Sequence, residues 1–453
     1  MAKRKTSYIC RACHHQLPRW QGQCPACQEW NTLEAVTPTT GTNTQGYSGQ
    51  TQTATLLSEV ATSENQQRLT TAFTEFDRVL GGGIVAGSVV LVGGDPGIGK
   101  SSILLQIASF LSQGQSVLYV AGEESLTQIA LRAKRMDLPT DRLMTMAETQ
   151  VEAITAYLQT HQPNMVVIDS IQTMQLARID SAAGGVSQIR ESTAVLTQVA
   201  KQTGIAVFLV GHVTKSGEVA GPRVLEHIVD TVVFIEGQSD HRYRLVRTLK
   251  NRFGPVNELG VFAMTEKGMK AVKNPSAIFL NQRQSSVPGS AIISIWEGTR
   301  PLLVEVQALV TDNEGGAPRR LAVGIEPNRL AMMIAIVQRY LNLPLGHKDV
   351  FVNIVGGIKV SETAADLAII AAIVSSLQDQ PIGQHCLFLG EVGLSGEIRP
   401  VAHAQERLQE AQKHGFNHAI IPVMNQSKHL QSPLKTVTIE RITALPELLK
   451  IGE

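Results

Sequence analysis

Aromatic side chains are scarce in this sequence, since phenylalanine, tryptophan and tyrosine together make up 4% of the residues. This scarcity fits a parallel α/β architecture better than an all-β sandwich. Long apolar runs are also missing, because none reaches the roughly 18 residues that a membrane-spanning helix needs. The basic stretch Met1–Lys5 precedes no apolar core of the kind that signal peptides contain. We therefore predict a cytoplasmic protein with no membrane partner.

An excess of charge of either sign is lacking as well. With 40 Lys and Arg residues against 39 Asp and Glu residues, the net charge is +1, so any nucleic-acid site must be a local feature. The length of 453 residues predicts two or three domains. Between Glu34 and Glu59 no residue is charged, and Thr, Gln, Gly and Ser dominate. Because such a stretch buries too little apolar surface to fold, we predict a flexible linker over residues 35–55.

Cysteine is rare too, but four of the five cysteines crowd into the first 27 residues. They form two C-x-x-C pairs, which are Cys10 with Cys13 and Cys24 with Cys27. Four thiolates at this spacing can complete the tetrahedral shell of one zinc ion, and a closed shell is typical of a structural site. We predict a zinc ribbon over residues 1–34 whose folding depends on the metal. Four unliganded thiols or a redox pair are the alternatives.

Residues 56–272 alternate short β-branched runs with helical patterns. Five near-continuous apolar runs are typical of strands in a parallel sheet with helices on both faces. These predicted strands cover residues 88–94, 116–122, 164–170, 205–213 and 231–237. Helical patterns such as Ser101–Leu111 and Leu126–Met136 fall between them. This order predicts a doubly wound α/β domain.

The run from Gly94 to Ser101 matches the phosphate-binding pattern G-x-x-x-x-G-K-[ST] and stands between a predicted strand and a predicted helix. In this pattern the glycines let backbone N–H groups surround the phosphates, the lysine reaches the β- and γ-phosphates, and the hydroxyl binds Mg²⁺. We therefore predict an ATP site. Its residues are Gly94, Asp95, Pro96, Gly97, Ile98, Gly99, Lys100, Ser101 and Ser102.

Polar residues also stand at the ends of other predicted strands, where a parallel sheet has its ligand crevice. Asp169 ends a buried strand as a Walker B carboxylate does, and we predict that it holds Mg²⁺ together with Ser101. A helix cap or turn is the alternative role for this aspartate. Glu123 and Glu124 follow a strand that we expect beside the phosphate-binding strand, and either can polarise the attacking water. Two glutamates in a solvated turn are the alternative. His212 ends another strand as a candidate γ-phosphate sensor, although a lone histidine is more often structural.

The order of these motifs resembles the bacterial RadA (Sms) family over essentially the whole chain. Besides the motifs above, the resemblance includes Gly211–Lys215 and the Lys-Asn-Arg-Phe-Gly segment at Lys250–Gly254. Members of this family are RecA-like, DnaB-type hexameric DNA motors of recombinational repair. The resemblance thus implies a RecA-like P-loop ATPase core and a DNA-dependent ATPase or helicase activity in branch migration. It further implies a homohexameric ring, single-stranded and branched DNA as ligands, and the recombinase RecA as a partner.

The resemblance also implies roles for individual residues. His212 falls at the γ-phosphate sensor position. Lys250 and Arg252 resemble a Lys-x-Arg pair that enters the ATP site of a neighbouring subunit, where cations neutralise transition-state charge; a solvated strand end is the alternative. The stretches 172–190 and 214–223 resemble DNA-contacting loops, although ordinary surface loops look similar. Their cations are Arg178, Arg190, Lys215 and Arg223.

Residues 273–453 have an α+β character and resemble the proteolytic domain of Lon, a ribosomal S5-type fold. The run Gly390–Val401 follows a Lon strand-turn-strand segment. Where Lon has its nucleophilic serine this chain has Ala364, and where Lon has its catalytic lysine this chain has Gln405. Because acyl transfer needs a nucleophile and a proton acceptor, we predict a proteolytically inactive domain. A displaced Ser-Lys dyad is the alternative.

The leading prediction for function is an ATP-driven DNA motor that extends or migrates recombination intermediates. A KaiC-like regulatory ATPase that works through protein partners is one alternative, and an ATP-dependent protease is the other. Stimulation of ATP hydrolysis by single-stranded DNA separates the motor from the regulatory ATPase. The missing serine and lysine argue against the protease.

Overall fold

A computed structural model describes most of the chain. The described residues are 7–10, 16–17, 20–30, 32–36, 68–211, 225–237, 242–280, 287–313, 315–383, 385–426, 430–432 and 434–450. The chain divides into two compact units, Met1–Ala61 and Thr62–Glu453. Among the described residues, no helix is long and apolar enough to cross a membrane. The finer domain boundaries stay predictions.

The first unit contains a three-stranded antiparallel sheet in the order β2-β1-β3. Its strands are β1 (Ser7–Cys10), β2 (Gln16–Leu17) and β3 (Leu33–Val36). The buried side chains described in this module are those of Cys10 and Cys24. A core of this size is too small to stabilise a fold by apolar burial, so the module needs another source of folding free energy.

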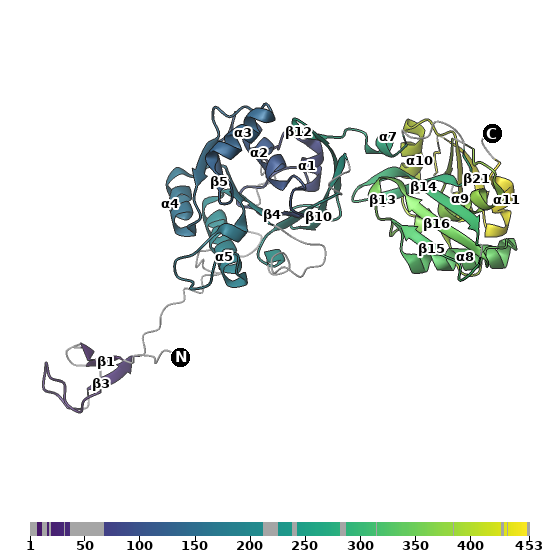
Figure 1. Cartoon of the computed structure of the whole chain (residues 1–453). Helices are drawn as coiled ribbons and strands as arrows, with labels where there is room; N and C mark the ends of the chain where they lie inside the picture. Colours follow the sequence, from purple (N-terminus) through teal and green to yellow (C-terminus); the bar gives the residue numbers. More distant parts are fainter. Residues whose placement is uncertain are drawn as a thin grey trace. The chain divides into compact units, whose positions relative to one another are not determined.

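The second unit begins with a nine-stranded sheet in the order β12-β11-β10-β9-β4-β8-β7-β5-β6 (Figure 1). The six strands from β9 to β6 are mutually parallel, which confirms the predicted parallel α/β core. The parallel strands are β4 (Val89–Gly94), β5 (Val117–Ala121), β6 (Met144–Ala147), β7 (Met165–Asp169), β8 (Ala206–Val210) and β9 (Thr231–Glu236).

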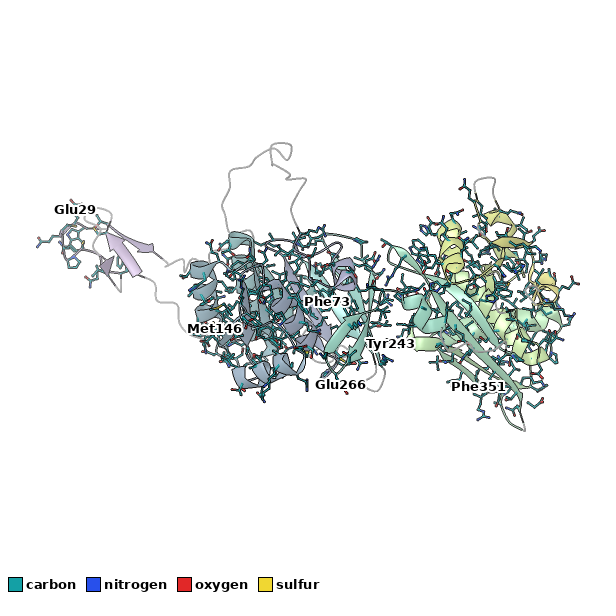
Figure 2. The ribbon with its side chains drawn as sticks, turned by 90° about the horizontal axis from the view of Figure 1, so that it is seen from above. Glu29, Phe73, Met146, Tyr243, Glu266 and Phe351 are labelled. Atoms are coloured by element: carbon teal, nitrogen blue, oxygen red, sulfur yellow. The ribbon has the colours of Figure 1, made fainter. Side chains whose placement is uncertain are left out.

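Helices cover both faces of this sheet (Figure 1). Helices α1 (Thr74–Val79), α2 (Lys100–Leu111) and α3 (Leu126–Arg135) share one buried apolar cluster with the sheet. Helices α4 (Val151–His161) and α5 (Val186–Thr203) share a second cluster on the opposite face. Side chains fill the space between layers, and Phe73 packs edge-on against Phe110 and Phe262 with ring centroids 5.9 and 6.2 Å away (Figure 2). The strands are therefore buried on both sides, as their continuous apolar runs indicate.

Local sequence signals set the ends of these helices. Helix α3 begins with a capping box, in which the Ser125 hydroxyl accepts from the Gln128 backbone N–H while the Gln128 side chain accepts from the Ser125 backbone. Helix α5 ends at Gly204, which adopts a left-handed φ of 77°. These helices are relevant to function because Arg132 of α3 pairs with Glu124 and Lys201 of α5 pairs with Asp230.

One topological expectation is wrong. The sequence predicts the strand before Glu123 beside the phosphate-binding strand, but β8 and β7 lie between β4 and β5. Strand β5 pairs instead with β7 and β6. Strand order depends on long-range pairing and crossover helices, which apolar patterns in the sequence do not encode. Glu123 consequently follows a strand, β5, that borders β7 and not β4.

Three strands extend the sheet beyond the parallel core. Strands β10 (Tyr243–Asn251), β11 (Leu259–Thr265) and β12 (Gly268–Ala271) pair antiparallel after β9. The doubly wound prediction did not include this antiparallel extension. Strand β10 is important for the site, because the Lys-Asn-Arg-Phe-Gly segment starts at its end.

The C-terminal part has a seven-stranded mixed sheet in the order β15-β16-β14-β13-β17-β20-β21 and a separate hairpin of β18 (Glu391–Val392) and β19 (Ile398–Arg399). This hairpin confirms the predicted strand-turn-strand segment. The sheet strands are β13 (Ser290–Glu297), β14 (Arg300–Asp312), β15 (Arg320–Val323), β16 (Lys348–Ile354), β17 (Cys386–Phe388), β20 (His418–Pro422) and β21 (Lys435–Ile439). The helices are α7 (Pro275–Leu280), α8 (Pro327–Leu341), α9 (Asp366–Gln378), α10 (Ala404–Lys413) and α11 (Leu445–Leu448).

Candidate active site

The phosphate-binding loop joins the end of β4 to the start of α2, as the sequence predicts. Gly94 adopts a φ of 147°, and a Cβ atom there would lie 2.7 Å from the carbonyl oxygen of Ile235. Any larger residue would therefore push the loop away from β9. The loop leads into the N-terminus of α2, where backbone N–H groups and the helix dipole favour an anion. This geometry fits the phosphates of a nucleotide.

Lys100 is the buried cation of this loop, with 3% of its surface exposed. Its Nζ atom donates to the carbonyl oxygens of Gly94 at 2.8 Å and Asp95 at 2.9 Å. Burial lowers the pKa of the Lys100 ammonium, while the nearby carboxylates of Asp169, Glu123 and Asp95 oppose that shift. The lysine therefore lies across the loop with its charge facing the carboxylates of the site.

Asp169 ends β7 and meets the loop through Ser101. Its Oδ1 atom accepts from the Ser101 hydroxyl at 3.1 Å, and its Oδ2 atom accepts from the Tyr119 hydroxyl at 2.5 Å. Burial raises the pKa of Asp169, and these two hydrogen bonds oppose the shift. Hydroxyl and carboxylate oxygens are the ligands that Mg²⁺ takes beside nucleotide phosphates. Ser101 and Asp169 therefore fit the predicted magnesium site.

Tyr119 contacts the predicted magnesium ligand Asp169, and the sequence reasoning missed it. It lies fully buried in the middle of β5. Burial and the neighbouring Asp169 carboxylate raise the pKa of Tyr119 well above its usual range, so the phenol stays protonated and donates. A hydroxyl-bearing ring within an otherwise aliphatic strand was the available signal.

The two glutamates after β5 turn in different directions. The Ser170 hydroxyl donates to the Glu123 carboxylate, and Ser170 directly follows Asp169. The Glu124 carboxylate instead forms an ion pair with Arg132 of α3. Of the two glutamates, Glu123 is the one whose charge contributes to the pKa shift of Lys100. Glu123 is therefore bound beside the Asp169 end of β7, while Glu124 is held by α3.

Lys250 and Arg252 lie at the opposite edge of the sheet from the phosphate-binding loop. Lys250 pairs with Val232 of β9, and β9 runs parallel to β4 with Thr231 beside Val90. The two cations are thus near the amino end of β4, whereas the loop follows its carboxyl end. The six residues of β4 span about 17 Å between these edges. Neither cation can belong to the nucleotide site of its own chain.

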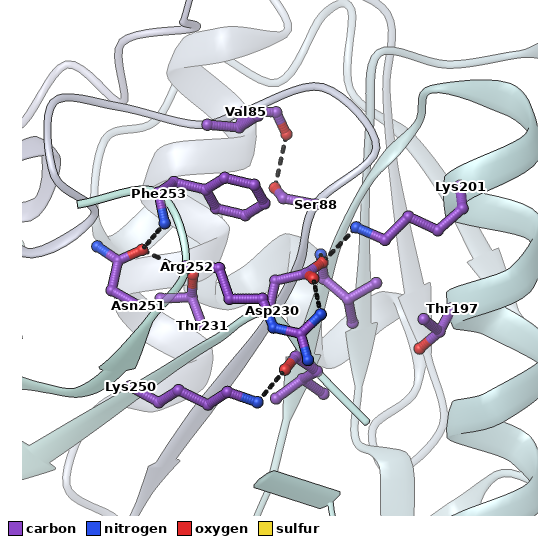
Figure 3. A network of polar contacts seen from close by, with 12 residues as sticks. Val85, Ser88, Thr197, Lys201, Asp230, Thr231, Lys250, Asn251, Arg252 and Phe253 are labelled. Atoms are coloured by element: carbon purple, nitrogen blue, oxygen red, sulfur yellow. Dashed lines mark hydrogen bonds and ion pairs between the residues drawn. The ribbon is translucent and has the colours of Figure 1, made fainter. Parts of the chain in front are cut away.

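Both cations have partners within the chain (Figure 3). The Lys250 Nζ atom donates to the carbonyl oxygens of Glu226 and, at 2.8 Å, Val229. Burial lowers the pKa of Lys250, and the positive charge of Arg252 adds to the shift. Arg252 Nη1 lies 3.5 Å from Asp230 Oδ1, and its side chain is 56% exposed. Lys250 is therefore fixed, whereas Arg252 is loosely held and open to solvent.

The rest of the Lys-Asn-Arg-Phe-Gly segment builds the turn that presents Arg252. The Asn251 Oδ1 atom accepts from the Phe253 N–H at 3.0 Å and from the Thr231 hydroxyl at 3.2 Å (Figure 3). A Cβ atom on Gly254 would lie 2.8 Å from the Cα atom of Gly81, so this close approach requires glycine. Asn251 and Gly254 thus have structural roles in this turn.

Some predicted DNA-contacting cations lie among the described residues. Arg178 is exposed and pairs at 3.4 Å with Glu191, a surface ion pair of little stabilising effect. Arg190 was predicted in a loop but is exposed on α5, because that helix begins at Val186. His212, Lys215 and Arg223 lie outside the described residues.

The predicted zinc ligands converge where they are described. The Sγ atoms of Cys10, Cys24 and Cys27 lie within 4.8 Å of one another, and those of Cys10 and Cys27 are 3.6 Å apart. Tetrahedral zinc with Zn–S bonds of about 2.3 Å places its sulfurs about 3.8 Å apart, so this cluster fits zinc. The fourth predicted ligand, Cys13, lies outside the described residues.

The positions that match the Lon catalytic dyad hold no nucleophile and no base. Ala364 is buried in a short 3-10 turn, and the Gln405 amide donates to the Gln431 carbonyl oxygen at 2.7 Å. Next to these positions, the fully buried Arg407 forms an ion pair with Glu362. The two segments that would carry the dyad are thus joined by a salt bridge, and the loss of proteolysis stays a prediction.

Comparison with protein families matches three parts of the chain. Residues 8–35 match a rubredoxin metal-binding domain, residues 57–218 match an AAA domain, and residues 328–425 match the ChlI subunit of Mg-chelatase. The AAA match and the strand-loop-helix geometry together identify a P-loop ATPase. The order of zinc ribbon, ATPase and C-terminal α+β fold agrees with the sequence-based prediction.

Full-length relatives give the family. The chain is 54% identical to the DNA repair protein RadA of Pseudomonas aeruginosa over 98% of each chain. It is 50% identical to the DNA repair protein RadA of Escherichia coli over 97% of each chain, and 46% identical to that of Bacillus subtilis over 94% of each chain. The phosphate-binding loop, the zinc-ribbon cysteines and these nearly full-length matches lead to one conclusion: this chain belongs to the RadA family of DNA repair proteins.

Proposed function

We propose that this chain is a DNA-dependent ATPase that acts as a helicase-type motor within a homohexameric ring. In this role it extends or migrates branched recombination intermediates. The observation that carries the proposal is the separation of Arg252 from the phosphate-binding loop across the full length of β4. A cation that stabilises phosphoryl transfer must reach the γ-phosphate, and Arg252 can reach only that of a second copy. Such head-to-tail contacts close into a ring when the rotation between subunits permits.

Within one subunit, the described side chains supply the parts that ATP hydrolysis needs. Ser101 and Asp169 would hold Mg²⁺, which neutralises phosphate charge when bound, and Tyr119 orients the Asp169 carboxylate. Lys100 would bind the β- and γ-phosphates. Glu123 would polarise the attacking water, because its carboxylate accepts from Ser170, next to Asp169, while Glu124 is held by Arg132.

Between subunits, Arg252 would complete the neighbouring site. Its exposure and its long 3.5 Å contact to Asp230 leave it able to move toward a partner. A guanidinium in the transition state is worth about 10³–10⁵ in rate. Because Arg252 of one subunit would complete the ATP site of its neighbour, hydrolysis at that site would be linked to movement between the two subunits.

DNA would contact the stretches that follow Asp169 and His212. In the first stretch, Arg178 and Arg190 are exposed cations, and Lys215 and Arg223 are the cations of the second stretch in the sequence. The names of the relatives, which are DNA repair proteins, support a DNA substrate. We further propose that a RecA-type recombinase is the partner. Co-sedimentation of the two purified proteins on single-stranded DNA would test this proposal.

Single-stranded DNA should stimulate ATP hydrolysis by about fivefold or more, as expected when two binding sites are coupled. Steady-state ATPase rates with and without oligonucleotide measure this, and negative-stain images of the same samples report rings. Stimulation without any ring would contradict the trans role of Arg252. An ATPase that forms rings but ignores DNA would favour a KaiC-like regulatory function. Degradation of casein would instead favour the ATP-dependent protease, despite Ala364 and Gln405 at the positions of the Lon serine and lysine.

Zinc should be needed by the first unit and not by the ATPase. We expect one zinc per chain in metal analysis, and a Cys24→Ser variant should lose that zinc because one of the converging sulfurs is gone. Its DNA-independent ATPase rate should stay near that of the wild type, because the nucleotide site lies in the separate second unit. A metal-free native protein would rule out the ribbon site.

A further inference from the structure

The exposed guanidinium of Arg252 shares the buried carboxylate of Asp230 with a second cation, Lys201. The Asp230 side chain is 3% exposed, and its Oδ2 atom accepts from Lys201 Nζ at 2.6 Å and from the Val89 N–H at 3.0 Å (Figure 3). Arg252 approaches the other oxygen at 3.5 Å. Lys201 is therefore the closer of the two cations to Asp230, and Arg252 makes the longer contact.

Lys201 is held in place from two sides. Its ammonium binds Asp230 and lies 5.8 Å from the ring centroid of Phe253, within the range of a cation–π contact. Phe253 belongs to the same turn that presents Arg252 (Figure 3). A buried carboxylate that loses its cation is costly to leave unpaired, and a second nearby cation can offset that cost. Among the described residues, Arg252 is the other cation paired with Asp230, and it could do this without Lys201.

The elements that carry this pair are those that the predicted DNA-contacting stretches lead into. Helix α5 begins within the first stretch, at Val186, and carries Lys201 in its last turn. Asp230 stands a few residues after the second stretch, in the segment whose Glu226 and Val229 carbonyl oxygens bind Lys250. Lys201 and Asp230 are thus carried by segments that adjoin the two predicted DNA-contacting stretches in the sequence.

We propose that Lys201 is a positioning residue that keeps Arg252 available to a neighbouring subunit by neutralising Asp230. When Lys201 pairs with Asp230, Arg252 is held only by its long contact and can enter the next ATP site. When that pair opens, Asp230 binds Arg252 within its own chain and the neighbouring site loses its cation. This inference rests on the proposed trans role of Arg252 and adds the control of its availability.

The test is a charge-rescue experiment on the full-length ring with single-stranded DNA. Lys201→Met should lower kcat about tenfold, because stronger pairing with Asp230 withdraws Arg252, while the KM for ATP changes little. Adding Asp230→Asn to Lys201→Met should restore most of the rate, because a neutral amide no longer attracts the guanidinium. Lys201→Arg, which keeps the charge, should behave like the wild type. A double variant as slow as Lys201→Met would overturn the inference.

Controls separate this inference from other failures. Lys267 pairs with Asp137 at 3.2 Å on the exposed surface, so Lys267→Met is a matched lysine variant that should leave kcat unchanged. Thermal melting reports folding, and Lys201→Gln replaces Lys201→Met if the latter does not fold. If Arg252→Ala hydrolyses ATP like the wild type, the trans role itself fails. If Arg252→Ala is inactive but the double variant is not rescued, only the role of Lys201 fails.

Discussion

Replacing Glu123 by glutamine should lower the rate of ATP hydrolysis by about 10²–10⁴-fold, the usual contribution of a positioned general base. The amide has nearly the same shape as the carboxylate and can still accept from the Ser170 hydroxyl. It cannot take a proton from water, however, so the chemical step should slow while nucleotide binding persists. Single-turnover hydrolysis and equilibrium binding of a fluorescent ATP analogue measure the two effects separately.

Glu124→Gln is the matched control for this prediction. Glu124 is the adjacent residue with the same side chain, but its carboxylate is committed to Arg132 of α3. The amide can still accept from the guanidinium, so we expect a rate loss of less than about tenfold, mainly through a weaker ion pair. If Glu124→Gln is the inactive variant and Glu123→Gln the active one, the assignment is reversed.

Replacing Arg252 by alanine should lower ATP hydrolysis by about 10³–10⁵-fold, the range known for arginines that stabilise phosphoryl transfer. ATP binding should persist, because the phosphate-binding loop lies at the other end of β4. Folding should also persist, because the Arg252 side chain is more than half exposed and its contact with Asp230 is long. Isothermal titration calorimetry measures ATP binding, and thermal melting measures whether the variant is folded.

Mixed rings decide whether Arg252 acts across subunits. Lys100→Ala subunits lack the phosphate-binding cation but carry an intact Arg252, and Arg252→Ala subunits are the reverse. In a random equal mixture, roughly one interface in four joins an intact loop to an intact arginine, so part of the activity should return. If mixed rings form and no mixing ratio restores hydrolysis, Arg252 does not act in trans and is a solvated or structural cation.

The matched control for the mixing experiment uses two variants with the same defect. Lys100→Ala subunits mixed with Lys100→Ala,Arg252→Ala subunits have no interface with an intact loop, so they should remain inactive at every ratio. Wild-type subunits mixed with Arg252→Ala subunits should lose activity in proportion to the interfaces that lack the arginine. If ATP hydrolysis appeared in the first of these mixtures, it would come from contaminating active protein and not from complementation between subunits.

Motifs made of neighbouring residues could be predicted from the sequence alone. The phosphate-binding loop, the paired cysteines and the strand-turn-strand segment at Gly390–Val401 each depend on residues close in the chain. Their local geometry follows from glycine, capping and ligand chemistry, so the pattern predicts the structure directly. The loop between β4 and α2 and the hairpin of β18 and β19 bear this out.

Relations between distant residues were decided only by the tertiary structure. The sequence placed the strand before Glu123 beside β4, but pairing placed β8 and β7 between them. It left Glu123 and Glu124 equivalent, and the ion pair of Glu124 with Arg132 of α3 separates them. It missed Tyr119, whose role depends on a hydrogen bond to Asp169 fifty positions later in the chain.

The same reason applies to the edge that we propose faces a second subunit. From the sequence, Lys250 and Arg252 were cations at a strand end, and only the resemblance to a family suggested what they do. The register of β10 on β9 and of β9 on β4 places them at the opposite end of the sheet from the phosphate-binding loop. Side-chain chemistry is written residue by residue in the sequence, but distance across a sheet is set by strand pairing, which is a long-range property of the folded chain.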